Sequence, residues 1–465
     1  MALSKIKLTE LNAISPLDGR YWRNVADLSP YVSEDTLIRT RLEIESKYLI
    51  SLSEVGLIRS LSASEKNILH NFGQGLTKKQ IIRVKEIEEI TRHDVKAVER
   101  SLREVLTGTS LKDVIEMLHF GLTSEDINNL AYRLMLKRAK DNICVPVLDQ
   151  VVNIFISLAK KYQDIPMLAR THGQAAIPTT LGKEMINFAS RLNTQVRKLD
   201  SLQLTGKING AVGNYNALVF AAPEVDWISF SEHFVSSLGL EPTLITTQIN
   251  FADDIIENFQ AFERINNVIV NIDTDIWRYI SDDWFTLEIK KGEIGSSTMP
   301  QKVNPVDFEN SKGNAEIANG MFSGLSRQLA VSWLQRDLSG STAHRNIGVG
   351  LAYSLLAYRS LLGGLKRISA NEEIIQKALN DNWNILGEAV QTLLRRQGHK
   401  DPYTTVASLT KGQKIDKKSW RTWVSKLPQK TTMVKSLLKL TPETYLGNAT
   451  ILVDLGIQKI KVSRK

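Results

Sequence analysis

The longest apolar stripe in this sequence runs through residues 255–280, where an apolar side chain recurs every three or four positions. Its members are Ile255, Phe259, Phe262, Ile265, Ile269, Ile272, Ile276 and Ile280. This spacing places the side chains on one face of an α-helix, which is roughly 38 Å long at about 1.5 Å per residue. Helices of that length in globular proteins pack lengthwise against one another. The stripe therefore predicts an all-α protein built around a bundle of long helices.

Two further stripes of the same kind predict more helices for this bundle. One consists of Cys144, Leu148, Val151, Phe155 and Leu158, and the other of Leu181, Met185, Phe188, Leu192, Val196 and Leu199. A single chain could hardly cover stripes of this length, so we expect several chains to share the core. Alternating strand patterns are scarce, and residues 217–222 form an ambiguous candidate.

The long helices predict a central domain flanked by two smaller helical domains. We expect an N-terminal domain at residues 1–112, a central long-helix bundle at 113–365 and a C-terminal domain at 366–465. Stretches rich in Gly, Ser, Asn and Pro predict loops at residues 170–180, 206–216 and 292–305. Loops on a rigid scaffold are where binding and catalytic residues concentrate, so these three are candidate site segments.

The composition is typical of a soluble globular protein, with 42% hydrophobic and 23% charged residues among 465. We find no apolar run of about 18 residues that would predict a membrane span. The lysines within residues 1–10 are not followed by the apolar stretch of a secretory signal. Cys144 is the sole cysteine, which excludes an internal disulfide and fits a reducing compartment. We therefore expect a cytoplasmic protein.

The basic charge balance raises the possibility of a nucleic-acid partner. Lys and Arg exceed Asp and Glu by nine, and the pI is about 9.3. The surplus is interpreted as spread along the chain, densest at residues 411–421 and 459–465, where interleaved aromatic residues are lacking. We therefore expect a solvated surface or a field that attracts anionic metabolites, with no nucleic-acid or membrane partner.

Several common site motifs are missing from the sequence. It contains no CxxC, no HExxH, no GxxxxGK[ST], no GxSxG and no GxGxxG after a predicted strand. The short Gly348–Gly350 motif lies in a helical pattern, and helix packing explains it better than phosphate binding. The sequence therefore indicates neither a metal nor an organic cofactor.

Two of the expected loops carry residues suited to acid–base chemistry. Residues 292–305 combine two glycines with Ser296, Ser297 and Thr298, followed by Lys302 and Asn304. A flexible loop of this kind can close over a reacting centre, although an ordinary interhelical loop has a similar composition. In the segment RTHGQ, His172 is a candidate proton shuttle or else a hydrogen-bonded structural histidine.

These two segments also carry a family resemblance. GSSTMPQKVNP at residues 295–305 resembles the signature loop of the fumarase/aspartase superfamily, whose helical members cleave C–N or C–O bonds by β-elimination, usually releasing fumarate. Other segments resemble the bacterial type of its adenylosuccinate lyase branch, namely SPLDGRY (15–21), RHDVKAVE (92–99), LTSEDINN (122–129), RTHGQ (170–174), GKINGAVGNYN (206–216) and WLQRDLSGSTAHRN (333–346). The resemblance implies the splitting of adenylosuccinate and of SAICAR without a cofactor, in a homotetramer whose active sites are shared between subunits.

The resemblance also implies roles for individual residues. Ser296 would be the general base and His172 the general acid, with Glu309 orienting His172, while His93 and His119 assist. Substrate-binding roles are implied for Arg20, Tyr21, Arg92, Asp94, Thr123, Ser124, Gln248, Ser297, Lys302, Asn304, Asn310, Arg336, Ser341 and Arg345. Arginines suit the phosphate end of such a substrate, because the guanidinium group binds phosphate oxygens in pairs.

Two residues depart from the usual pattern of this branch. Gln301 stands where histidine is common, and glutamine there is familiar from argininosuccinate lyases. Arg92 stands where asparagine is frequent. The alternatives are therefore another fumarate-releasing lyase, chiefly an argininosuccinate lyase, and a non-catalytic relative that keeps only the fold. The joint retention of Ser296, His172 and Lys302 with Glu309 argues against the second.

Overall fold

The computed structural model describes residues 9–289, 292, 298–412, 415–427 and 431–464. The chain forms two compact units, each made of three chain segments. The first unit comprises residues 1–147, 198–267 and 313–357, and the second comprises 148–197, 268–312 and 358–465. The three-domain division with boundaries near residues 112 and 365 stays a prediction.

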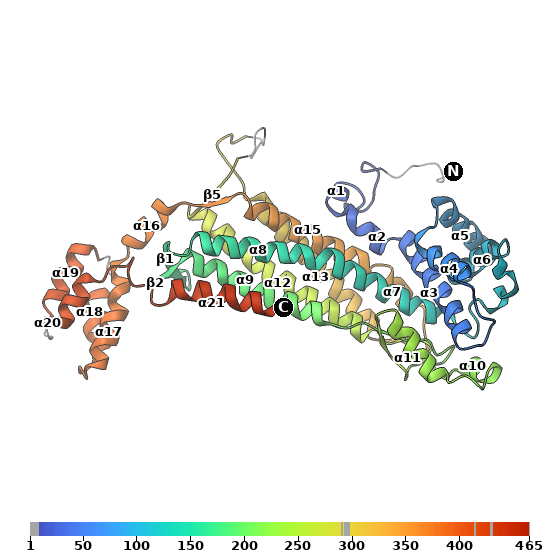
Figure 1. Cartoon of the computed structure of the whole chain (residues 1–465). Helices are drawn as coiled ribbons and strands as arrows, with labels where there is room; N and C mark the ends of the chain where they lie inside the picture. Colours follow the sequence, from blue (N-terminus) through green and yellow to red (C-terminus); the bar gives the residue numbers. More distant parts are fainter. Residues whose placement is uncertain (1–8, 290–291, 293–297, 413–414, 428–430, 465) are drawn as a thin grey trace. The chain divides into compact units, whose positions relative to one another are not determined.

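The first unit contains the N-terminal helices, and Figure 1 shows α3–α6 grouped together near the N-terminus. Its elements are α1 (Trp22–Val25), η2 (Ala26–Leu28), α2 (Ser29–Val32), α3 (Glu34–Glu54), α4 (Ala63–Gln74), α5 (Lys78–Thr91), α6 (Asp94–Leu106), η3 (Ser110–Asp113), η4 (Ile115–Met117), α7 (Ser124–Ala139), η5 (Lys140–Cys144), β3 (Thr205–Gly206), α10 (Asn216–Ala221), α11 (Trp227–Ser237), β4 (Glu241–Pro242) and α14 (Ser339–His344). Apolar side chains of α3–α6 form a common core, which includes Leu42, Leu49, Val98 and Leu102.

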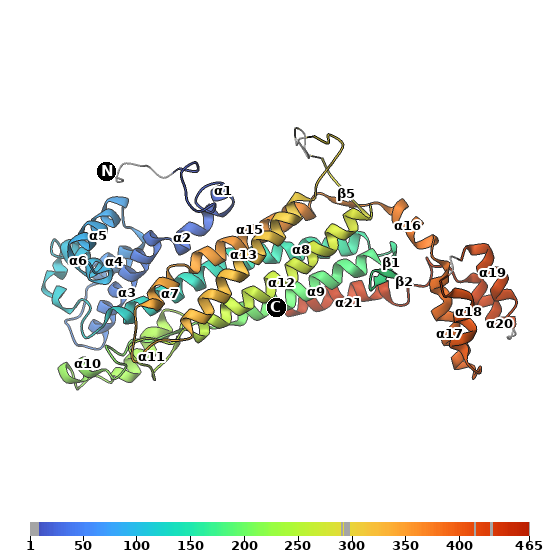
Figure 2. The same ribbon diagram turned by 180° about the vertical axis from the view of Figure 1, so that it is seen from behind.

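The second unit contains two short antiparallel strand pairs and the C-terminal helices. Its elements are β1 (Pro166–Thr171), β2 (Gln174–Thr180), β5 (Phe285–Leu287), β6 (Ile368–Ala370), α16 (Glu372–Asn380), η6 (Trp383–Leu386), α17 (Gly387–Arg396), α18 (Pro402–Thr410), α19 (Lys417–Ser425), α20 (Thr431–Lys439) and α21 (Ala449–Ser463). In Figures 1 and 2, α21 lies beside α8 (Val145–Lys161) and α9 (Leu181–Ser201). Lys160 pairs with Asp454 at 2.9 Å, and Asn193 donates to Ser463.

The predicted long helices are confirmed. The ranges of α8 (Val145–Lys161), α9 (Leu181–Ser201), α12 (Asp253–Ser281), α13 (Val306–Leu329) and α15 (Ile347–Leu365) cross the boundaries between the units. Except for Ile280, which is half-buried, the residues of the three stripes are buried within this one chain. The expectation that a single chain could not cover the stripes is therefore wrong.

Two local predictions need correction. Residues 170–180 do not form an irregular loop, because β1 and β2 pair as a hairpin in which Thr171 faces Gln174. Residues 217–222, the ambiguous strand, lie mostly in α10. The packing interpretation of Gly348–Gly350 is confirmed, since a Cβ on Gly350 would lie 2.6 Å from the Phe322 ring.

In the described part of the chain, one helical run, Ser124–Lys161, is long and apolar enough to cross a membrane by length and composition alone. Its most apolar 18-residue window has a mean hydropathy of 1.6, and half of it is buried inside the structure. Core helices of water-soluble proteins pass the same test. The expectation that no such apolar run exists is wrong for this run, which includes the π-helical segment η5 with the buried Cys144.

Candidate active site

A cavity of about 710 Å³ in the first unit is lined by many of the predicted site residues. Its lining includes Arg92, His93, Asp94, Ser124, Arg336, Ser341 and Arg345, which come from three separate parts of the sequence. Three arginines and two serine hydroxyls face one space, and this donor set suits a phosphate or another oxyanion. Their roles in substrate binding stay predictions.

Helix ends place these side chains at the cavity. Helix α5 ends at Thr91, and Arg92 is its C-cap residue with a φ of 55°, a left-handed conformation that terminates the helix. His93 then caps α6, because its Nδ1 accepts the Lys96 backbone N–H at 3.1 Å. Asp94 follows as the first residue of α6, and Ser124 is the first residue of α7.

Asp94 links two arginines at the wall of the cavity. One of its carboxylate oxygens accepts from Arg41 at 2.7 Å and from Arg345 at 3.0 Å. Burial favours the neutral acid, but Arg41 and then Arg345 outweigh it, so the pKa of Asp94 lies below its usual value. The ionised Asp94 thus orients the guanidinium group of Arg345, which also forms an ion pair with Glu34 at 3.0 Å.

Arg41 is a cavity residue that the sequence analysis missed. It lies on the buried face of α3 with only 1% of its side chain exposed, and it also donates to Asn128 at 2.9 Å. A charged residue within the apolar face of a helix is costly unless it is paired. That pattern, Leu37 and Ile38 before Arg41 and Leu42 after it, could have identified the residue.

We expect Arg41→Gln to raise KM by roughly ten-fold or more while kcat changes little, because a lost hydrogen bond to a charged group costs about 1.5–3 kcal/mol. Arg41→Lys should recover part of this loss. Steady-state kinetics with thermal unfolding of each variant measures both effects.

Arg133→Gln is the matched control for Arg41. Arg133 is equally buried and pairs with Asp254 at 2.8 Å, yet it does not line this cavity. The Arg133→Gln variant should be destabilised as Arg41→Gln is, while its KM stays unchanged. Equal KM changes in the two variants would contradict a positioning role for Arg41.

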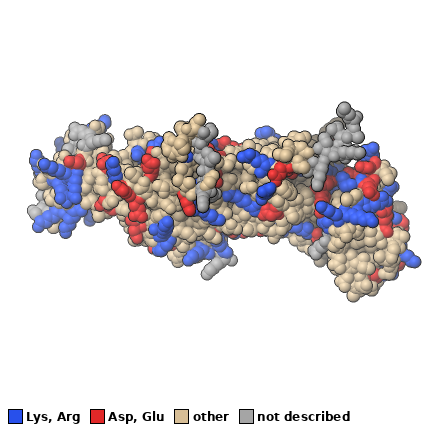
Figure 3. Space-filling model, turned by 90° about the horizontal axis from the view of Figure 1, so that it is seen from above, with Lys and Arg blue, Asp and Glu red and all other residues tan. Residues whose placement is uncertain are grey.

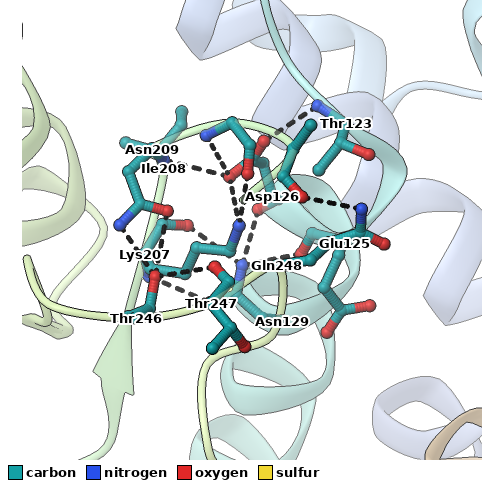
Figure 4. Close-up of polar contacts among 12 residues, drawn as sticks. Thr123, Glu125, Asp126, Asn129, Lys207, Ile208, Asn209, Thr246, Thr247 and Gln248 are labelled. Atoms are coloured by element: carbon teal, nitrogen blue, oxygen red, sulfur yellow. Dashed lines mark hydrogen bonds and ion pairs between the residues drawn. The ribbon is translucent and has the colours of Figure 1, made fainter. Parts of the chain in front are cut away.

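Figure 4 shows a buried polar network at the start of α7. Asp126 and Lys207, both fully buried, pair at 2.9 Å. Asp126 also accepts the backbone N–H groups of Thr123, Asn209 and Gly210. The segment 206–216 is therefore fixed against the start of α7.

Gln248 connects this segment to the cavity. Its side-chain amide donates to the Ala211 carbonyl at 2.8 Å, and its oxygen accepts from Arg336 at 3.0 Å. Arg336 also lies 3.5 Å from Glu125. Gln248 and Arg336, two of the residues predicted to bind substrate, are therefore in contact, although Gln248 itself is absent from the cavity lining.

His119 forms a separate acid–base pair in the first unit. Its Nδ1 lies 2.6 Å from a carboxylate oxygen of the buried Glu45. Burial lowers the pKa of His119, but the Glu45 charge and hydrogen bond outweigh burial and raise it above the ordinary value. A φ of 58° at His119 holds the backbone in the left-handed region, which is uncommon outside glycine and marks functional sites.

Other predicted residues of the first unit lie away from the cavity lining. Arg20 is exposed and Tyr21 is half-buried, just before α1. Thr123 is the N-cap residue of α7, and its backbone N–H donates to the Asp126 carboxylate at 2.8 Å. The structure does not bring these three into the space that Arg345 faces.

The second unit carries His172 at the tip of the β1–β2 hairpin. His172 and Gly173 form the two-residue turn with φ values of 53° and 72°, and positive φ at both positions is typical of a type I′ turn. The His172 side chain is exposed, and so is Glu309 in the first turn of α13. In the described part of the chain, no hydrogen bond joins the two, so the predicted pairing is not formed within this chain.

The remaining predicted residues belong to the signature loop at residues 295–305 and to the start of α13. Ser296 and Ser297 lie outside the described residues. Lys302 is exposed, Asn304 is half-buried, and Asn310 is exposed on α13. The first turn of α13 is anchored where Arg367 donates to Asp307 at 2.9 Å. Among the described residues, no cluster of three or more His, Cys, Asp or Glu could hold a metal ion.

Comparison with known proteins gives the family. The lyase family model matches residues 25–320, and the adenylosuccinate lyase C-terminal model matches residues 332–446. The chain resembles the fumarate lyase of Mesorhizobium sp. BNC1 with a TM-score of 0.75 at 18% identity, over 93% of this chain and 97% of that one. The chain therefore belongs to the lyases of the fumarase/aspartase superfamily, and the predicted all-α fold is confirmed.

Sequence relatives narrow the family further. The adenylosuccinate lyase of Escherichia coli (strain K12) is 43% identical over 97% of this chain and 99% of its own length. That of Legionella pneumophila (strain Corby) is 44% identical over 96% of this chain and 99% of its own length. Within the superfamily, the chain belongs to the adenylosuccinate lyases.

Proposed function

We propose that the chain splits adenylosuccinate into AMP and fumarate, and SAICAR into AICAR and fumarate. The observation that carries the proposal is the cavity in which Arg92, Arg336 and Arg345 converge with Ser341. Such a donor set suits the phosphate of a nucleotide substrate. Near-full-length identity to adenylosuccinate lyases supports the choice of substrate.

The proposed chemistry is a β-elimination. Ser296, acting as an alkoxide, takes a proton from the carbon between a carboxylate and the carbon that bears the C–N bond, and becomes a neutral hydroxyl. Lys302 and Asn304 stabilise the resulting dianion. The C–N bonding pair leaves with the nitrogen, which takes a proton from His172, and Glu309 orients His172. His93 and His119 assist at the substrate.

Assembly into a homotetramer completes the proposed site. In the described part of the chain, His172 and Glu309 are exposed and share no hydrogen bond, which leaves both side chains accessible to residues of other subunits. Helix α21 exposes Ile451, Leu452 and Leu455 by 45–58%, and an exposed apolar face of this kind is typical of a subunit contact. Light scattering should give about four times the chain mass of 52.2 kDa, and a monomeric mass would contradict the proposal.

A fumarate-release assay tests the function. We expect release from adenylosuccinate and SAICAR in the cytoplasmic pH range, with none from argininosuccinate or malate. Release from argininosuccinate alone would contradict the substrate assignment. It would favour an argininosuccinate lyase, the alternative that Gln301 suggests. Absence of fumarate release from every substrate would favour a non-catalytic relative.

A further inference from the structure

The positive charge of the chain is concentrated in residues 387–440. This segment has twelve Lys and Arg residues against three Asp and Glu residues, an excess of nine. The formal net charge of the whole chain is also +9, so the remaining residues are balanced between acidic and basic. The interpretation that the surplus is spread along the chain is therefore wrong.

The basic side chains of this segment that the structure describes are exposed and lie outside its ion pairs. Those that the structure describes are Arg395, Arg396, Lys400, Lys411, Lys417, Lys418, Arg421, Lys426, Lys435 and Lys439, which we call the basic surface. Every one is exposed, and none is among the ion pairs found in the described part of the chain. Figure 3 shows blue side chains gathered over α17–α20, at the left of the view.

The fold of α17–α20 does not need these charges. Helix α19 buries Trp420 and Val424 completely and turns Lys417, Lys418 and Arg421 to solvent. Asp416, one of the few acidic residues, is used to cap α19. The charges are thus available to a partner, because apolar contacts stabilise the helices.

The chemistry of the surface indicates an extended polyanion. Ten cations distributed over several helices cannot converge on one small ligand, whereas a phosphate backbone offers a charge at every nucleotide. Within residues 387–440, Tyr403 is the one large hydrophobic side chain exposed in the described part, so membrane insertion has little apolar support. Tyr403 and the half-buried Trp423 are aromatic rings on which bases can stack.

We propose that the basic surface binds single-stranded nucleic acid without sequence preference, independently of the lyase site. Phosphate contacts supply affinity of this kind, and each contact releases counterions. About five contacts on a single strand give a slope near −3.5 in log affinity against log salt, which is roughly 100-fold between 50 and 200 mM.

Fluorescence anisotropy of the full chain with a labelled mixed-sequence 30-nucleotide RNA tests this. The triple variant Lys417→Gln/Lys418→Gln/Arg421→Gln should weaken binding at least ten-fold and reduce the salt slope by about 2. The control Lys78→Gln/Lys79→Gln/Lys112→Gln removes the same charge from exposed positions of the first unit and should bind as the wild type does. Fumarate release should be unchanged in both variants.

Four outcomes would overturn the proposal. One is absence of binding at 50 mM salt, and another is an equal loss in both triple variants, which would mean that net charge alone is responsible. Equal competition by polyglutamate would instead indicate an acidic protein partner. Retention on phosphatidylserine vesicles without RNA binding would indicate a membrane surface. None of these results bears on fumarate release, so the lyase proposal is tested separately.

Discussion

Replacing His172 by asparagine should lower kcat by about 10²–10⁴-fold, because the variant loses the group that protonates the leaving nitrogen. Asparagine is chosen because His172 has a φ of 53°, and asparagine tolerates the left-handed region better than most residues. The hairpin turn should therefore survive. Stopped-flow or steady-state fumarate release measures kcat, and thermal unfolding should show little change.

The control for this variant is His70→Asn. His70 is exposed on α4 in the first unit, away from the residues proposed to act in catalysis. Its replacement should leave kcat within about two-fold of the wild type. A turnover number for His172→Asn within a few-fold of the wild type would remove His172 from the proposed mechanism. A parallel loss of unfolding temperature would reassign it to the stability of the hairpin.

Replacing Lys207 by methionine should destabilise the protein by about 3–5 kcal/mol, because it leaves the Asp126 carboxylate buried without its cation. The backbone donors of Thr123, Asn209 and Gly210 offset part of the loss. Urea denaturation of the purified variant gives the free energy of unfolding. The double variant with Asp126→Asn should recover part of the loss, since the unpaired charge is then absent.

Lys137→Met provides the matched control for Lys207→Met. Lys137 pairs with Asp141 at 2.7 Å on the surface of α7, where both side chains are about one-third exposed. Surface pairs of this kind contribute about 0.3–0.5 kcal/mol. A similar free-energy change for the two lysine variants would show that the buried pair is not a main support of residues 206–216.

The sequence predicted the long helices well, because burial repeats along them. Phe259, Phe262 and Ile265 recur at helical spacing and are all buried, so one physical cause acts at every turn of α12. The hairpin at residues 166–180 was not predicted, because its turn residues, His172 and Gly173, are also typical of an irregular loop. The conformation of such a turn depends on two φ angles, which residue types indicate only weakly.

The candidate site was predicted in part. Motif resemblance found Arg92, Asp94 and Arg345, which the structure brings to one cavity. It missed Arg41, whose importance comes from a contact with Asp94 made across 53 positions of sequence. The pairing of His172 with Glu309 stays a prediction, because no hydrogen bond joins the two side chains in the described part of the chain.

The burial of Cys144 has a practical consequence for spectroscopy. The chain's one native thiol is enclosed within the helical run and should react slowly with maleimides under native conditions. A cysteine introduced at an exposed position of residues 295–305, such as Val303→Cys, would then be the fast-reacting label site. Fluorescence from that single dye could follow the segment during turnover without any background substitution in the protein.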